Sequence, residues 1–178
     1  MTLEIKNPDD CKVLRWCIRA LAKDDVRQYP NYLHAENGQI IVTDGKRIHQ
    51  IDSMLSIPDE VYSVAKNLKR RIVLDEDPIG FPIPDIVWVM TKAPASTVSI
   101  AKAERPMVLS PEATWQRVAR IIIDAHDALE GKSFSFRPDW VYQMIELGFN
   151  EIRADVGRNP SLYMSADNRS ARLMRFKL

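Results

Sequence analysis

At 178 residues, with 46% hydrophobic and 28% charged side chains, the chain has the composition of an ordinary globular protein, which excludes an intrinsically disordered chain and a membrane-embedded one. The formal net charge is only +1, so overall charge cannot hold nucleic acid, and any such binding must come from a local basic patch. The length is sufficient for one substantial hydrophobic core and fits one domain or at most two small ones.

The cysteines and the N-terminal residues bear on the cellular compartment. Cys11 and Cys17 are six residues apart on an expected helix, where ~100° per residue places them on different faces. Two thiols without a Cys/His cluster favour a reducing compartment over a disulfide or a zinc site. Residues 1–10 lack a basic-then-apolar signal, and no run approaches the ~18 apolar residues of a membrane-spanning helix. We therefore expect a cytoplasmic protein with no membrane association, no metal and no cofactor.

The first expected elements are a short strand and a helix with one basic face. Residues 2–6 alternate apolar and polar side chains, as a strand does, and the Asn/Asp cluster at 7–10 is typical of a helix N-cap. The apolar periodicity predicts a helix from about residue 10 to residue 23. The basic side chains of this helix fall within one narrow arc: Lys12, Arg15, Arg19 and Lys23.

Two interpretations of this basic face are open. It is either the ordinary exposed side of an amphipathic helix or a surface that attracts phosphate, with an affinity that falls steeply with salt. The second interpretation is supported by the absence of acidic residues between positions 11 and 23, because no i,i+4 ion pair then neutralises the face.

Three strands are expected in tandem after the helix. They are predicted at residues 31–36, 39–43 and 46–52. The first two are separated by Asn37-Gly38, a favoured two-residue hairpin turn, and the last two by Asp44-Gly45. Asp-Gly between strands is, by itself, ordinarily just a turn.

The middle of the chain predicts further strands and a long helix. The expected elements are strands at residues 61–66, 71–75 and 97–101 and a helix from Ser110-Pro111 to about Leu129. The buried stripe of that helix is expected to be Trp115, Val118, Ala119, Ile122 and Leu129. The basic segment at 66–71 is either a phosphate contact or, more simply, a charged hairpin end.

The C-terminal stretch predicts one more strand, a helix and three final strands. They are expected at residues 132–136, 138–147, 151–156, 162–166 and 171–178. The helix at 138–147 contains Asp139 and Glu146 but no lysine or arginine.

Two parts of the chain resemble one known family. The succession of basic helix, strand, glycine turn and strand, with Val-Thr-Asp-Gly-Lys-Arg-Ile at residues 42–48, resembles the first half of a domain of the bacterial DNA polymerase sliding clamp, the β-clamp family. In that family the turn typically reads Ala-Thr-Asp-Gly-His-Arg-Leu. The C-terminal succession, which closes with Leu-Met-Arg-Phe-Lys-Leu at 173–178, is similar to the family's final half-domain, with Arg175 in place of a proline.

The resemblance implies an α+β fold that is DNA-clamp-like, with helices packed on antiparallel sheets in two quasi-equivalent half-domains. It implies a single clamp-like domain over residues 1–178. Within it, residues 1–52 form the first half, 53–130 a divergent middle region or insertion, and 131–178 the second half.

The resemblance also implies a function. Clamps encircle duplex DNA, meet its phosphates through the basic faces of inner helices, and act as non-enzymatic, homo-oligomeric processivity factors for DNA polymerase and other replication or repair proteins. The implied DNA contacts are Lys12, Arg15, Arg19 and Lys23. The implied pocket for partner peptides consists of Thr43, Gly45, Lys46, Arg47 and Ile48 with Leu173 and Met174. Because the family builds this pocket from adjacent domains, we expect it here between subunits.

Two alternatives remain. A clamp-fold module of phage or plasmid type, an accessory protein or a decoy, would bind protein partners without encircling DNA, and the helix at 138–147 without basic residues agrees with it. A small hydrolase would use Asp44, His49 and Asp52, but no nucleophile, glycine-rich phosphate loop or metal-spaced cluster accompanies them.

Overall fold

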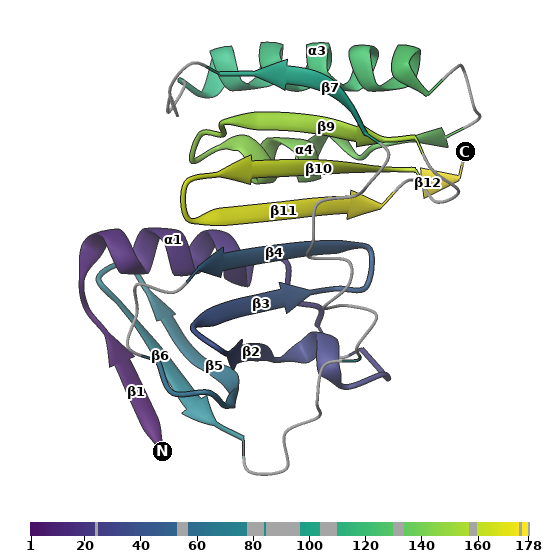
Figure 1. The fold of residues 1–178 in the computed structure, drawn as a ribbon. Helices are drawn as coiled ribbons and strands as arrows, with labels where there is room; N and C mark the ends of the chain where they lie inside the picture. The colour runs from purple at the N-terminus through teal and green to yellow at the C-terminus, as the bar shows by residue number, and fades with distance from the viewer. Residues whose placement is uncertain are drawn as a thin grey trace. The chain divides into compact units, whose positions relative to one another are not determined.

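The computed structural model divides the chain into two compact units, Met1–Val89 (unit 1) and Met90–Leu178 (unit 2). The residues it describes are 1–23, 25–52, 57–77, 84, 97–103, 110–129, 134–156, 160–174 and 176–177. Each unit contains an antiparallel sheet with helices packed against it (Figure 1).

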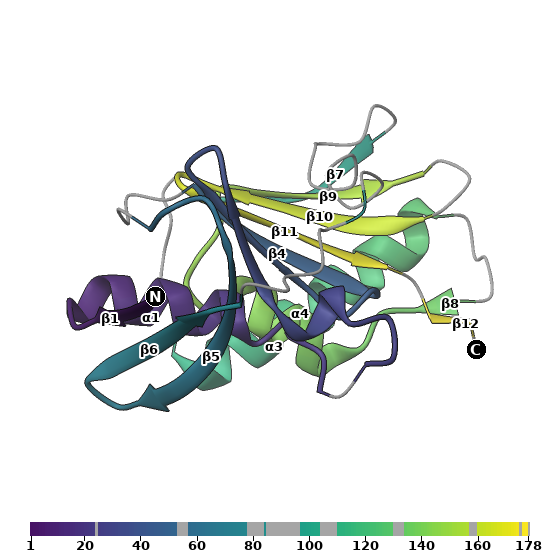
Figure 2. The same ribbon diagram turned by 90° about the horizontal axis from the view of Figure 1, so that it is seen from below.

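In unit 1, six described strands form an antiparallel sheet with a helix against one face (Figures 1 and 2). The helices are α1 (Pro8–Ile18) and the 3-10 helix η1 (Tyr29–Asn31). The strands are β1 (Thr2–Ile5), β2 (Leu33–Glu36), β3 (Gln39–Thr43), β4 (Arg47–Asp52), β5 (Val61–Leu68) and β6 (Arg71–Glu76). Their order in the sheet is β1-β6-β5-β2-β3-β4, and α1 packs against β3, β4 and β6.

Helix α1 is fixed at its start by a cap and along its length by the core of unit 1. The side-chain oxygen of Asn7 accepts hydrogen bonds from the backbone N–H groups of Asp9 (2.9 Å) and Asp10 (3.3 Å), which satisfies donors that a helix start leaves free. Leu14 and Cys17 are completely buried, as are many side chains of the strands. The expected N-cap cluster is therefore confirmed.

The helix is shorter than the prediction of residues 10 to 23, because α1 ends at Ile18. The N–H groups of Ala20 and Leu21 donate to carbonyls only three residues back, and the N–H of Ala22 donates to the Pro30 carbonyl (3.0 Å). The backbone after Ile18 therefore leaves the helical path, and Ala22 forms a hydrogen bond with η1. As a consequence, Lys23 lies outside α1.

The three tandem strands after the helix are confirmed as β2, β3 and β4. The β2–β3 turn has Asn37 at φ 52° and Gly38 at φ 71°, the positive values that the favoured two-residue hairpin turns require. The β3–β4 connection contains Gly45 at φ 81°.

In unit 2, the described strands form a four-stranded antiparallel sheet and a small two-stranded one. The helices are α3 (Pro111–Ala128) and α4 (Pro138–Ile145). The strands are β7 (Thr97–Lys102), β8 (Phe134–Ser135), β9 (Glu151–Asp155), β10 (Ser161–Ala166), β11 (Arg169–Met174) and β12 (Phe176–Lys177). The sheets have the orders β11-β10-β9-β7 and β12-β8. Helix α3 packs against β7 and α4, and α4 packs against β11. Residues 132, 133, 175 and 178 belong to the strands predicted at 132–136 and 171–178 and lie outside the described residues.

The buried stripe predicted for α3 is wrong in part. Trp115, expected in the core, is 48% exposed and packs against Tyr142 of α4, with ring centroids 4.7 Å apart and tilted by 33°, and Ala119 is exposed. Thr114 is buried instead, because its hydroxyl donates to the Ser110 carbonyl (2.8 Å) and so loses no hydrogen bond on burial. Val118 and Leu129 are buried as predicted, and the core face also includes Ile121, so the buried face is rotated from the predicted stripe.

The predicted fold class is confirmed: the protein is α+β, with helices packed on antiparallel strands in a clamp-like fold. The segment 53–130 is divided between the units, because β5 and β6 belong to the sheet of unit 1, whereas β7 and α3 belong to unit 2. Among the described residues, no helix is both long and apolar enough to span a bilayer.

Candidate functional site

The basic residues predicted on the first helix occupy different positions in the structure. Lys12 is exposed on α1, Arg15 is partly exposed one turn later, and Arg19 is exposed at the C-cap of the helix. Lys23 is exposed but lies past the end of α1. Lys12, Arg15 and Arg19 therefore share the helix face that the periodicity predicted. Lys23 lies in the segment after the helix, so the helix does not fix its position.

Arg15 is held by the hairpin that β5 and β6 form. Its Nε donates to Oδ1 of Asn67 (3.1 Å), and its Nη2 donates to the carbonyls of Leu68 and Lys69, the latter at 2.9 Å. A planar guanidinium suits such a fork of acceptors, since its donors diverge in fixed directions. Arg15 keeps its positive charge, but much of its hydrogen-bonding capacity is used within unit 1.

The Thr-Asp-Gly turn between β3 and β4 is fixed by its own side chains. The Thr43 hydroxyl donates to the Arg47 carbonyl (2.7 Å) and accepts from the Gly45 N–H (2.9 Å). One carboxylate oxygen of Asp44 accepts from the N–H groups of Lys46 (2.9 Å) and Arg47 (3.0 Å). Short polar side chains that satisfy nearby N–H groups are typical of turns. The turn is thus pre-formed before any partner binds.

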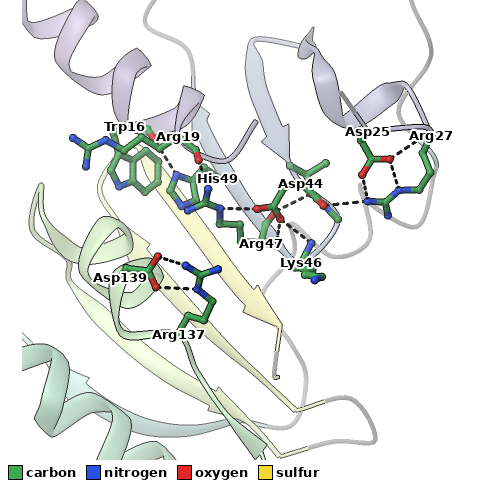
Figure 3. Close-up of polar contacts among 12 residues, drawn as sticks. Trp16, Arg19, Asp25, Arg27, Asp44, Lys46, Arg47, His49, Arg137 and Asp139 are labelled. Atoms are coloured by element: carbon green, nitrogen blue, oxygen red, sulfur yellow. Dashed lines mark hydrogen bonds and ion pairs between the residues drawn. The ribbon is translucent and has the colours of Figure 1, made fainter. Parts of the chain in front are cut away.

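Arg47 connects this turn to the end of α1 (Figure 3). Its Nε donates to the other carboxylate oxygen of Asp44 at 2.9 Å, and its Nη2 donates to the Arg19 carbonyl. The Arg47 side chain is only 10% exposed, so this ion pair is partly shielded from solvent. The residue predicted as a pocket side chain therefore performs an internal role, joining the basic helix to the turn.

Arg27 contacts the turn from outside, and no sequence pattern predicted this contact (Figure 3). Its guanidinium pairs with both carboxylate oxygens of Asp25, at 2.8 and 2.6 Å, and donates to the Asp44 carbonyl at 3.1 Å. Hydrogen bonds from Arg27 lower the pKa of Asp25 to about 2. A Cβ atom added to Gly45 would lie 2.4 Å from Nη1 of Arg27, so the absence of a side chain at Gly45 admits the guanidinium. Arg27 and Asp44 are 17 residues apart in the sequence, so local sequence patterns cannot predict their contact.

The predicted pocket residues differ in exposure. Gly45 and Lys46 are exposed at the tip of the turn. Thr43, Ile48 and Leu173 are 1%, 3% and 1% exposed, so their side chains belong to the interior of the chain. The turn residues belong to unit 1, and Leu173 and Met174 belong to β11 of unit 2.

The residues considered for a hydrolase do not converge. His49 is completely buried against Trp16, whereas Asp44 is bound to Arg47. Asp52 is exposed and accepts a hydrogen bond from Gln39 (3.1 Å). The hydrolase hypothesis is therefore wrong for these three residues.

Helix α4 has a different charge pattern from α1. Its sequence, Pro138–Ile145, contains no lysine or arginine. Arg137, at its N-cap, binds Asp139 through two hydrogen bonds of 3.0 and 2.6 Å (Figure 3) and lies over the Trp140 ring at 4.8 Å. The charges of Arg137 and Asp139 therefore neutralise each other at the start of α4.

These features define a class: a clamp-like α+β protein with a basic helix before a pre-formed Thr-Asp-Gly turn. Solved bacterial sliding clamps share the fold. The DNA polymerase sliding clamp of Pseudomonas aeruginosa aligns with 100% of this chain and 67% of its own, with a TM-score of 0.56 and 13% identity. The DNA polymerase III β subunit of Thermotoga maritima aligns with 100% and 66%, with a TM-score of 0.57 and 11% identity.

A third solved clamp is the Helicobacter pylori β clamp, whose structure contains a DNA ligase peptide. It aligns with 99% of this chain and 66% of its own, with a TM-score of 0.54 and 10% identity. No family model matches the sequence, and no curated protein matches it. The chain therefore shares the clamp fold with proteins of which it spans about two thirds.

Proposed function

We propose that this chain is a sliding-clamp-like processivity factor, a non-enzymatic scaffold that acts on duplex DNA as a homo-oligomer. The observation that carries the proposal is the basic row of α1 in a clamp-like fold. Lys12, Arg15 and Arg19 follow one face, and the helix carries acidic residues only in its first turn. Sequence-independent attraction to phosphate is what movement along DNA requires.

Lys12, Arg19 and Lys23 are proposed as the direct phosphate contacts. Arg15 adds to the positive potential, while its donors hold the β5–β6 hairpin. Arg47 holds the C-terminal end of the basic row in place, because its guanidinium donates a hydrogen bond to the Arg19 carbonyl. This division of roles separates residues whose removal weakens DNA binding from residues whose removal weakens the fold.

The proposed docking site for DNA polymerase or another replication or repair protein is the Thr-Asp-Gly turn. Its exposed residues, Gly45 and Lys46, would meet the partner peptide, and the buried Thr43, Arg47 and Ile48 would hold the turn in shape. From another copy of the chain, the partly exposed Met174 would line the proposed pocket, and the buried Leu173 would support it. Support comes from the Helicobacter pylori β clamp, which was solved with a DNA ligase peptide.

The test is duplex binding as a function of salt. Fluorescence anisotropy with two labelled duplexes of unrelated sequence should give equal affinities that fall linearly on a plot of log Kobs against log salt. The variant K12Q/R19Q/K23Q should reduce the magnitude of the slope by about 2 to 3, since each lost phosphate contact removes about 0.9. The control K102Q/R120Q, which removes exposed charges in unit 2, should keep the wild-type slope. A wild-type protein that ignores duplex DNA at low salt would refute the proposal.

A second candidate is a clamp-fold module, of phage or plasmid type, that binds proteins without encircling DNA. It is favoured by α4, which offers no basic side chain in Pro138–Ile145 and pairs Asp139 with Arg137. Under this candidate, reversing charge with K12E/R19E/K23E should leave the binding of a polymerase-derived clamp-binding peptide intact, and wild type should not bind DNA. Calorimetry with the peptide tests docking, and duplex binding by the wild-type protein distinguishes the two functions.

A further inference from the structure

The hairpin formed by β5 and β6 ends in two basic residues that turn chemistry does not explain. Leu68 pairs with Arg71, which leaves Lys69 and Arg70 as a two-residue turn, named here the hairpin tip. The favoured two-residue turns need positive φ and so select glycine or asparagine. Among the described non-glycine residues, positive φ occurs only at Gln28 and Asn37, so the tip has neither the residues nor the backbone of a favoured turn.

The hairpin tip is braced by α1. The carbonyls of Leu68 and Lys69 accept from Nη2 of Arg15, and Asn67 accepts from its Nε. Backbone carbonyls at a turn would otherwise be left to solvent. Arg15 lies on α1 between Lys12 and Arg19, so the brace brings the tip beside the middle of the basic row of α1.

The register of the hairpin separates two faces. Asn67 pairs with Ile72, and since paired residues share a face, both lie toward α1, where Ile72 is completely buried and Asn67 meets Arg15. Lys66 pairs with Val73, and Arg71 is two residues from Val73, so Lys66 and Arg71 lie on the opposite face. A bulge between Val64 and Lys66 sets this arrangement.

The two faces differ in charge balance. On the face away from α1, Arg71 pairs with Glu4 at 2.7 Å and Lys6 pairs with the same carboxylate at 2.8 Å, whereas Lys66 is exposed. Lys12, Lys69 and Arg70 are exposed, and no carboxylate of the described residues lies within 4.0 Å of their charged nitrogens. The structure therefore gathers unneutralised positive charge from two elements around Arg15.

We propose that the hairpin tip and the basic row of α1 form one continuous surface for the phosphate backbone of duplex DNA. The proposal rests on the proposed function and adds a second contact element to it. The seven residue steps from Lys12 to Arg19 rise by about 10 Å, the length of about three phosphate spacings on one strand. Charges on two braced elements suit a polymer of phosphates, because successive phosphates can meet both elements at once.

The experiment compares two matched pairs on the same hairpin in the full chain. K69Q/R70Q removes the tip charges, and K66Q/R71Q removes one lysine and one arginine from the opposite face. Binding of a labelled duplex is measured over a salt series, and unfolding by urea confirms that each variant is folded. We expect K69Q/R70Q to reduce the magnitude of the salt slope by about 1 to 2, and K66Q/R71Q to retain the wild-type slope.

Each other outcome overturns the proposal. Equal losses in the two pairs would show that binding follows net charge. An unchanged slope in K69Q/R70Q, with a reduced slope in K12Q/R19Q/K23Q, would exclude the tip and leave the proposed function standing. Wild type without duplex binding would refute both. Binding to phosphatidylglycerol vesicles that is lost in K69Q/R70Q, with duplex binding unchanged, would assign the tip to a membrane surface.

Discussion

At the residue scale, His49 ties α1 to the sheet of unit 1. Its imidazole stacks on Trp16 with ring centroids 4.3 Å apart, and its Nδ1 donates to the Trp16 carbonyl at 2.8 Å (Figure 3). Its Nε2 is buried and has no hydrogen-bond partner among the described residues, which favours the neutral ring. Burial is the main cause that lowers the pKa of His49 to about 3. The hydrogen bond to the Trp16 carbonyl acts in the opposite direction, and the positive charges of Arg47 and Arg19 lower the pKa further.

His49 predicts a loss of stability in weak acid. An unfolded histidine titrates near 6.5, so between about pH 6.5 and pH 3 the unfolded chain binds the additional proton and stability falls as the pH falls. From pH 7 to pH 5 this residue should lower the free energy of unfolding by about 2 kcal/mol. His34, whose pKa burial also lowers, adds in the same direction.

Urea unfolding at the two pH values measures this effect. The variant His49→Phe keeps an aromatic ring beside Trp16 but cannot titrate, so its stability should change less between pH 7 and pH 5 than that of wild type. Equal pH dependence in the two proteins would contradict the role of His49.

At the element scale, α1 and the β5–β6 hairpin are joined through Arg15. Three donors of one side chain meet Asn67 and two backbone carbonyls, and an arginine fork suits that arrangement better than a lysine does. The brace holds two strands of unit 1 against its helix at a point far from the helix cap.

Arg15→Lys should therefore destabilise the protein although it preserves the charge. We expect a loss of about 1 kcal/mol in the free energy of unfolding, since a single ammonium cannot replace all of the hydrogen bonds. Lys12→Arg, on the same exposed face without such a brace, serves as the control and should unfold like wild type. Urea titration measures both variants, and hydrogen exchange at the amides of β5 and β6 should be faster only in Arg15→Lys.

The sequence was sufficient for features that depend on local rules. The Asn7 cap, the tandem strands and the Asn37-Gly38 turn follow from cap chemistry, period-2 alternation and turn preference, and all three are present. The position of Arg15 on the exposed side of α1 also follows from helical periodicity.

Features that depend on distant contacts were not predictable. The end of α1 is decided by the pairing of Ala22 with Pro30, and the bonds of Arg15 and Arg27 reach 54 and 17 residues along the chain. The buried face of α3 includes Thr114, because its hydroxyl donates a hydrogen bond to the Ser110 carbonyl. Periodicity ranks side chains by polarity, and it contains no information on which partner satisfies a polar group.

At the scale of the whole molecule, the chain has a clamp-like fold, and its basic row on α1 lies in unit 1. A clamp acts by surrounding DNA, so the proposed function requires a closed homo-oligomer. Attachment to DNA would then have two parts: an electrostatic part that salt removes and a topological part that salt leaves intact.

Retention on end-blocked DNA separates the two parts most directly. The protein is bound at low salt to a linear duplex with biotin at both ends, streptavidin is added to half of the sample, and the salt concentration is then raised. A ring should remain on the blocked duplex and slide off the open one. Equal loss from both duplexes at high salt would contradict encirclement and with it the clamp function proposed for this chain.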